Sequence, residues 1–218
     1  MEARSLTSDE FREVISNFAS GVTVVTVVHD GRPYGTTASA VASLSLEPPM
    51  LLICMNKQSE TGRAVAAARR FAVNILGANQ ANLAERFAQK GGDKFAGVAT
   101  SPGEWGEPLF VEALATLECR VVEETTGGTH YVFIAEVVSG SASGGTPLAY
   151  FRGQFGRLEL TLGQFEHARD PLYDELRAAD ADLVAAIDGG DLNRALDAIR
   201  NRCKRMAGIA RARIDGSR

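Results

Sequence analysis

The sequence is poor in residues that hold metal ions or form disulfides. Its 218 residues include three cysteines and three histidines, and Cys54, Cys119 and Cys203 lie far apart in the chain. No pair has the spacing of a zinc site or of a disulfide framework. Cys54 and Cys119 lie in apolar runs, where a free cysteine is expected to be buried as a small hydrophobic residue. The cysteines therefore predict a reducing, cytoplasmic environment and no metal centre.

Long apolar runs and an excess of positive charge are absent as well. No run approaches the roughly 20 apolar residues needed to span a bilayer, and the N-terminus opens into an amphipathic segment without the apolar core of a signal peptide. The formal net charge is −4, so nothing favours nucleic acid or an anionic membrane as a partner. No G-x-G-x-x-G or P-loop pattern follows a predicted strand, which leaves a Rossmann domain unsupported.

The most unusual stretch, residues 35–49, is rich in hydroxyl groups and alanine. Its hydroxyl groups belong to Thr36, Thr37, Ser39, Ser43 and Ser45. They alternate with small or aliphatic residues, as on a strand with one face packed inward. The small residues would let a planar ligand approach the backbone, and the hydroxyls offer donors and acceptors. A solvated edge strand explains the pattern equally well. Pro48 and Pro49 are expected to end this segment and start a new one.

Short strand patterns dominate the first 162 residues. The first element predicted is a helix with a capping box at Thr7 and Glu10, one buried face and an end at Gly21. A hairpin turning at Asp30-Gly31 follows. Further strands are expected at 50–55 and 71–76, both buried, at 115–125 and 130–139, and within 148–162. Helices are expected at 62–69, capped by Ser59 or Thr61, and at 79–90, with 93–112 irregular. Because strands and helices do not alternate, we predict an antiparallel barrel with helices outside it.

The pattern changes after about Leu162. Apolar residues then recur at helical spacing, interrupted at residues 189–191. This predicts a helical hairpin that is too thin to hold a core of its own. Two parts follow, a barrel domain at 1–162 and a C-terminal helical extension at 163–218.

A series of motifs resembles, in sequence order, the short-chain flavin reductases of the split-barrel FMN-binding superfamily. The motifs are FASGVTVVT at 18–26, TAS at 37–39, SLEPP at 45–49, FAVNIL at 71–76, DKF at 93–95, GTH at 128–130 and PLAYFRG at 147–153. The resemblance covers residues 11 to about 158. It implies a homodimer of six-stranded antiparallel split β-barrels that reduces FMN or FAD with NADH or NADPH. It also implies a partner monooxygenase that receives the reduced flavin.

The resemblance further implies a set of site residues. Thr37, Ala38, Ser39 and Ala40 would line the isoalloxazine and ribityl chain, with Ser45 and Leu46 nearby. Asn56, Ser59 and Thr61 would hold the phosphate end. His130 would be catalytic on the nicotinamide side, where Tyr150, Phe151 and Arg152 would shape the pocket. The family's acidic residue before this histidine is Thr129 here, which leaves the orientation of His130 and the choice of pyridine nucleotide open.

Two other functions stay open at this point. The protein could retain FMN as an electron carrier, or as an oxidase or oxygenase, because one fold supports several functions. Alternatively, the C-terminal hairpin could be a regulatory module, because residues 185–200 faintly resemble helical ligand-binding domains of transcription regulators. The sequence does not choose between FMN and FAD or between NADH and NADPH, and it does not name the oxygenase or its substrate.

Overall fold

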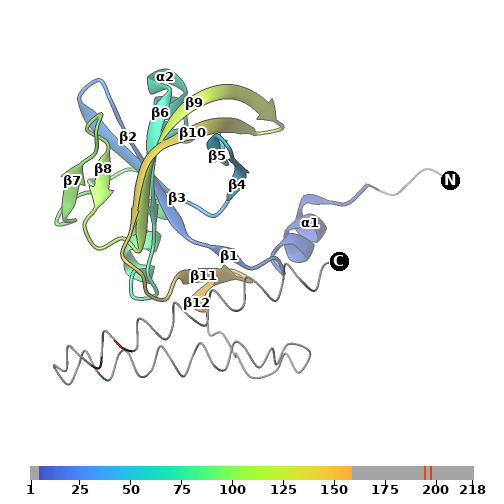
Figure 1. Cartoon of the computed structure of the whole chain (residues 1–218). Coiled ribbons are helices and arrows are strands. Elements are labelled where there is room, and N and C mark those ends of the chain that lie inside the picture. The colour runs from blue at the N-terminus through green and yellow to red at the C-terminus, as the bar shows by residue number, and fades with distance from the viewer. Residues whose placement is uncertain (1–4, 159–193, 195–196, 198–218) are drawn as a thin grey trace, which may run out of the picture. The chain divides into compact units, whose positions relative to one another are not determined.

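The computed structural model describes residues 5–158 together with Arg194 and Asp197. The predicted boundary at residue 162 and the predicted C-terminal helical hairpin lie outside the described residues, as does its regulatory role. Antiparallel strands dominate the described part, accompanied by short helices (Figure 1). No helix in this part of the chain is long and apolar enough to cross a membrane.

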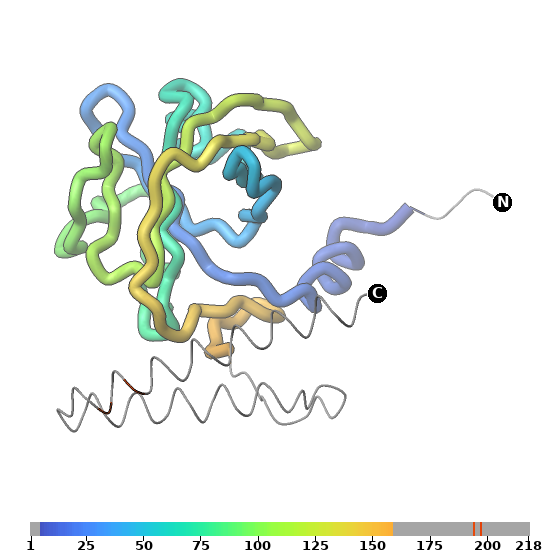
Figure 2. The backbone as a smooth tube through the Cα atoms, in the orientation of Figure 1, coloured from blue at the N-terminus to red at the C-terminus, as the bar shows by residue number. Residues whose placement is uncertain are grey.

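The largest sheet has seven strands in the order β3-β2-β6-β9-β10-β5-β4, where the sequence predicted a six-stranded barrel. The strands are β2 (Thr23–His29), β3 (Arg32–Ala38), β4 (Val41–Leu46), β5 (Pro49–Asn56), β6 (Arg70–Ile75), β9 (Ala115–Gly127) and β10 (His130–Ala142). Its two edge strands, β3 and β4, are separated in the chain only by Ser39 and Ala40. The sheet therefore curls round on itself (Figure 2), but β3 and β4 are not paired with each other in the described sheet. The result is a barrel with a split between these two edges.

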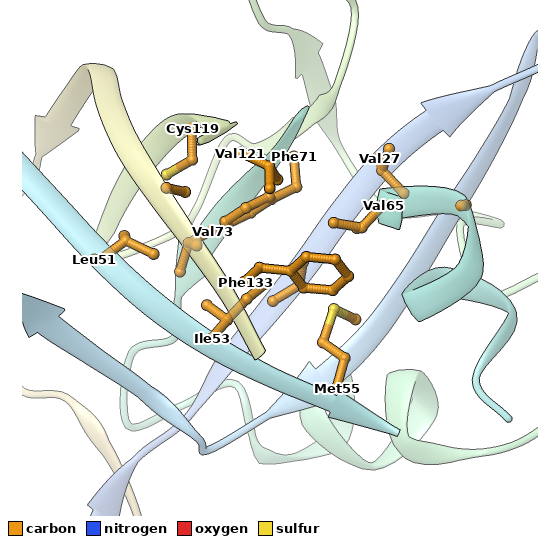
Figure 3. Packing of buried hydrophobic residues seen from close by; sticks show 13 residues of the cluster. Val27, Leu51, Ile53, Met55, Val65, Phe71, Val73, Cys119, Val121 and Phe133 are labelled. Carbon is orange, nitrogen blue, oxygen red and sulfur yellow. The ribbon is translucent and has the colours of Figure 1, made fainter. Parts of the chain in front are cut away.

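Apolar side chains from five strands fill the inside of the curled sheet. Figure 3 shows Phe71 and Phe133 among the valine, isoleucine and leucine side chains of this cluster. Burial along β5 alternates: Ile53 and its inward-facing neighbours are buried, whereas Cys54 is only partly buried. The prediction that this strand is buried on both faces is therefore wrong, as is the burial of Cys54. Cys119 is fully buried, and this desolvation raises the pKa of its thiol to about 12.

Helix α1 (Ser8–Ile15) has the predicted capping box, in which Thr7 and Glu10 bond to each other's backbone N–H. The helix ends at Ile15 and not at Gly21. None of its residues is buried, and Val14 and Phe18 are 64% and 75% exposed. The prediction of a buried face is thus wrong within the described residues, where the apolar side chains on and just after this helix are exposed.

The remaining elements frame the barrel. Helix α2 (Glu60–Ala68) packs on β2 and β3, and helix α3 (Ala81–Ala88) packs on the same two strands and ends before the predicted stop at Gly91. The region predicted to be irregular contains a small sheet of β7 (Thr100–Pro102) and β8 (Pro108–Phe110). A separate three-stranded sheet joins β1 (Ser20–Gly21), β11 (Leu148–Phe151) and β12 (Gln154–Arg157).

Candidate functional site

A polar groove of about 920 Å³ runs along β3. Its walls come from residues 32–36 of β3, from residues between 56 and 63 at the end of β5 and the start of α2, and from residues 88–95 after α3. Successive side chains of a strand point to opposite faces, yet all five consecutive residues 32–36 border the groove. The groove therefore follows the edge of β3 that pairs with no other strand in residues 5–158.

Gly35 allows one wall of the groove to approach β3 closely. A Cβ atom at this position would lie 2.5 Å from the ring of Phe87 on α3 and 3.1 Å from the ring of Phe95. The two rings pack edge to face, with their centroids 5.0 Å apart. Any side chain at residue 35 would push α3 and the following segment away from the strand.

Lys94 is fixed at the groove by this close packing. Its Nζ atom donates hydrogen bonds to the carbonyl oxygens of Gly35 and Phe87, each at 3.2 Å. An ammonium group has three donors, so one remains for a ligand. Burial lowers the pKa of Lys94 from its usual value, while the carboxylate of Glu60 acts in the opposite direction. Lys94 thus places a partly desolvated positive charge opposite the start of α2.

The N-terminus of α2 forms the facing wall. The hydroxyl of Ser59 caps the helix by accepting from Gly62 N at 3.3 Å, and Thr61 is 3% exposed. A Cβ on Gly62 would lie 2.9 Å from the carbonyl oxygen of Asn56, so the helix begins directly against the end of β5. In the part of the chain that the structure describes, the N–H groups of Glu60 and Thr61 donate no hydrogen bond. Unpaired N–H groups at the start of a helix favour the binding of an anion there.

His130 lies next to this helix start. It is directly opposite Asn56 in the β5–β10 ladder. The turn before it is fastened to the same segment, because Lys57 N donates to the carbonyl oxygen of Thr129 at 3.0 Å, and Lys57 Nζ donates to that of Gly128 at 3.1 Å. The hydroxyl of Thr129 lies 2.9 Å from His130 Nδ1. The structure thus brings His130 together with Asn56 and the start of α2, and gives its ring a hydrogen-bond partner.

The residues predicted to line the flavin ring lie at the end of β3 beyond the groove. Thr37 donates its hydroxyl to the carbonyl oxygen of Ala84 at 2.6 Å, so it faces α3. Ala38 packs against the barrel core, and Ser39 and Ala40 are exposed in the link to β4. In their place, Gly35 and Thr36 border the groove.

The predicted neighbours on β4 do not border the groove either. The hydroxyl of Ser45 accepts from Glu47 N at 3.2 Å, within the turn that leads to β5. Leu46 is 86% exposed. Both residues lie on the second free edge of the sheet, across the split from β3.

Tyr150, Phe151 and Arg152 are not brought to His130 within one chain. Arg152 donates two hydrogen bonds to Asn17 Oδ1, at 3.0 and 2.6 Å, which tie it to the chain just after α1. Its guanidinium lies over the ring of Phe151, 5.3 Å from the centroid. Figure 1 shows β11 at the lower end of the barrel, far from the β9–β10 turn where His130 begins β10.

Several groove residues were missed by the sequence reasoning. Lys94 belongs to the DKF motif, which matched the family without receiving a role, and Arg32 and Tyr34 follow the hairpin turn without any distinguishing pattern. Three or more potential metal ligands do not come together anywhere in residues 5–158.

The comparisons with known proteins decide the family. Residues 15–159 match the model of the flavin reductase like domain. The chain belongs to this family. It is 55% identical over 147 residues to the reductase component of a 4-nitrophenol 4-monooxygenase/4-nitrocatechol 2-monooxygenase of Rhodococcus opacus, covering 67% of this chain and 79% of the relative. It is 39% identical over 165 residues to the reductase subunit HsaB of a flavin-dependent monooxygenase of Mycobacterium tuberculosis, covering 74% and 88%.

A solved structure agrees with this assignment. The crystal structure of nitrilotriacetate monooxygenase component B from Mycobacterium thermoresistibile superposes with a TM-score of 0.69 at 36% identity, covering 75% of this chain and 93% of that one. The predicted family and the mainly antiparallel β fold are confirmed, and the flavin reductase is an oxidoreductase.

Proposed function

We propose that this flavin reductase is the reductase component of a two-component monooxygenase. It uses NADH or NADPH to reduce FMN or FAD and supplies the reduced flavin to a separate monooxygenase. The observation that carries the proposal is the 55% identity to a component of this kind, in a chain whose groove combines Lys94 with the start of α2. The name of that relative supports a phenol as the substrate of the partner monooxygenase.

The groove fits the phosphate of a flavin. Its lining carries four cationic and two acidic side chains, and a helix N-terminus and the Lys94 ammonium offer hydrogen-bond donors. In this proposal Asn56, Ser59, Thr61 and Lys94 hold the phosphate. The small residues Thr37, Ala38, Ser39 and Ala40 continue the edge of β3 and leave room for the flavin ring, with Ser45 and Leu46 across the split.

The chain's own contribution is to bind and orient. A bound flavin supplies the acceptor for a hydride. His130, held by Thr129 beside Asn56, positions the nicotinamide-containing donor on one side of that site. Backbone N–H groups along the free edge of β3 stabilise negative charge in the groove.

A homodimer completes the site in this proposal. His130 lies apart from Tyr150, Phe151 and Arg152 in one chain, so the two groups form one pocket only if a second copy supplies one of them. The uncovered apolar side chains of Phe11, Val14 and Phe18 offer a surface for that second copy.

Anaerobic stopped-flow absorbance tests the function. A small amount of protein is mixed with excess flavin and NADH, and bleaching of oxidised flavin is followed near ~450 nm, a property of the flavin ring. We expect many flavin molecules to be reduced per protein chain. Reduction of a single equivalent would instead show a flavoprotein that keeps its FMN, as an electron carrier or oxygenase.

A further inference from the structure

We infer that Lys57 is a positioning residue for the reaction, although it does not line the groove. It fixes the two-residue loop that leads into His130, and so sets where this ring meets the pyridine nucleotide. The inference rests on the proposed function and deepens it, because it gives a role to a residue outside the predicted site.

The loop before His130 is short, and its conformation sets the direction of this side chain. Gly127 and His130 are paired across the β9–β10 hairpin, so Gly128 and Thr129 alone make the turn. Gly128 has a φ of 54°, which suits a glycine in a two-residue hairpin loop. His130 is the first residue of β10. A change in the loop would therefore turn the Cα–Cβ bond of His130.

The end of this hairpin has little packing to hold it. Residues 122–129, which include the last six residues of β9 and the loop, are all exposed. Apolar burial therefore does not fix the loop. Apart from the pairing of the strands themselves, its conformation depends on hydrogen bonds from neighbouring residues, and a segment held in this way opens easily when such a bond is lost.

Lys57 holds both carbonyl groups of the loop. Its backbone N–H donates to the carbonyl oxygen of Thr129 at 3.0 Å, and its Nζ atom donates to that of Gly128 at 3.1 Å. Within residues 5–158 its ammonium group makes no ion pair with a carboxylate. A hydrogen bond from a charged donor is stronger than a neutral one. The partly buried side chain of Lys57 is thus committed to the loop.

The segment that carries Lys57 is fixed independently on its other side. Asn56 and Gln58 line the groove, whereas Lys57 between them does not. Gln58 N donates to the side-chain oxygen of Asn56 at 2.8 Å, and Arg63 Nη1 donates to the carbonyl oxygen of Gln58 at 3.0 Å. The Lys57 side chain therefore connects a fixed wall of the groove to an exposed loop. It can act on His130 without touching the flavin.

Steady-state kinetics with three variants tests this role. Lys57→Met removes the ammonium group and keeps the side-chain length, Lys57→Arg keeps a charged donor, and Arg157→Met removes a positive charge from an exposed position on β12. We expect Lys57→Met to raise the KM for NADH about 5- to 10-fold, the effect of one hydrogen bond. Its kcat and flavin Kd should stay within about twofold of the wild type. Lys57→Arg should recover most of the loss, and Arg157→Met should change none of these values.

A double-mutant cycle separates positioning from a general structural role. Because Lys57 acts through the His130 ring, Lys57→Met should raise the KM for NADH by less than about twofold in a His130→Ala background. If the two substitutions are additive instead, Lys57 does not act through His130 and the inference is wrong. An equal loss of flavin affinity in Lys57→Met would also overturn it, because Lys57 would then support the groove wall and not the loop.

Hydrogen exchange, measured without flavin or NADH, reports the loop directly. We expect the amides of β9 and β10 next to the loop to exchange faster in Lys57→Met, and at wild-type rates in Lys57→Arg and Arg157→Met. Unchanged exchange in Lys57→Met would show that the lysine does not hold the loop. Failure of the proposed function looks different, because the wild type would then not reduce flavin with NADH, whatever the exchange rates are.

Discussion

The hydroxyl of Thr129 lies 2.9 Å from Nδ1 of His130, at the start of β10. A hydroxyl can donate or accept, so it pairs with either tautomer of a neutral imidazole. His130 itself is paired with Asn56 in the β5–β10 ladder. Thr129 therefore gives the His130 ring a hydrogen-bond partner at the position where the family resemblance implies an acidic residue, without adding a negative charge beside the ring.

Replacing Thr129 tests whether this contact positions His130. In Thr129→Val the ring loses its partner, and we expect the KM for NADH to rise about 3- to 10-fold, which corresponds to one neutral hydrogen bond. Flavin Kd should stay unchanged. In Thr129→Asp a carboxylate favours the charged imidazolium, so the pH dependence of turnover should move to higher pH. A change in melting temperature with an unaltered KM and pH profile would indicate a purely structural contact.

Lys94→Met tests the phosphate region. Losing one charge-assisted hydrogen bond costs about 2 kcal/mol, so we expect FMN to bind roughly 30-fold more weakly. Riboflavin lacks the phosphate and serves as the control, because its affinity should not change. Titration by fluorescence quenching gives both values. An equal loss for riboflavin would place Lys94 at the ring and not at the phosphate.

The lowered pKa of Lys94 also predicts a pH dependence of stability. Burial lowers this pKa in the folded chain below the usual value of 10.5. Between the two values the unfolded chain binds more protons, so this group makes the free energy of unfolding rise with pH in that window. Urea unfolding of the wild type and of Lys94→Met at a series of alkaline pH values measures this. The free energy of unfolding of Lys94→Met should lack this rise with pH. If the wild type and the variant change equally with pH, the lowered pKa of Lys94 does not contribute to stability.

Gly35→Ala tests the close approach of α3 to β3. The new methyl group would overlap the ring of Phe87, and such overpacking destabilises by about 1–3 kcal/mol. Gly156→Ala is the control, because nothing lies within 4 Å of a Cβ at that position. Denaturant unfolding gives both free energies. Equal stabilities of the two variants would show that α3 can move away from Gly35 without a loss of stability.

Phe18→Asp tests the dimer. Phe18 is 75% exposed in one chain, so a charge there should leave the folded monomer intact and oppose association. We expect sedimentation velocity to show a monomer for this variant and a dimer for the wild type and for Arg12→Gln, a polar control on the preceding helix α1. Because the proposed site needs two copies, turnover of Phe18→Asp should fall as its dimer is lost. A dimer of unchanged stability in Phe18→Asp would place the interface elsewhere.

Local patterns predicted much of this fold. The Asp30-Gly31 turn, the buried strand at Phe71 and the Ser59 cap each depend on residues close together in the chain. The apolar spacing of α1 correctly indicated a helix, but the spacing cannot say whether its apolar face packs on the same chain. Within the described residues Phe11 and Val14 of this helix stay exposed.

The groove could not be predicted from local patterns, because it is formed by contacts between residues far apart in the sequence. Lys94 reaches Gly35 across 59 positions of sequence, and no periodic pattern connects them. The sequence could group Asn56, Ser59 and Thr61, because these residues are close together in the chain, at the end of β5 and the start of α2. Arg152 resembles the family motif in sequence, but its hydrogen bonds to Asn17 place it at the other end of the barrel from His130.

The free edge of β3 has a consequence for solubility. An unpaired edge strand is a template on which another extended chain can add, and this is a common route to aggregation. In this protein the edge is flanked by residues 88–95, and Lys94 already occupies the carbonyl of Gly35. If reduced flavin leaves this groove as proposed, the rest of the edge is open to solvent once in every turnover. We expect the segment after α3 to limit the addition of another chain at this edge, because Lys94 already holds one of its carbonyl groups.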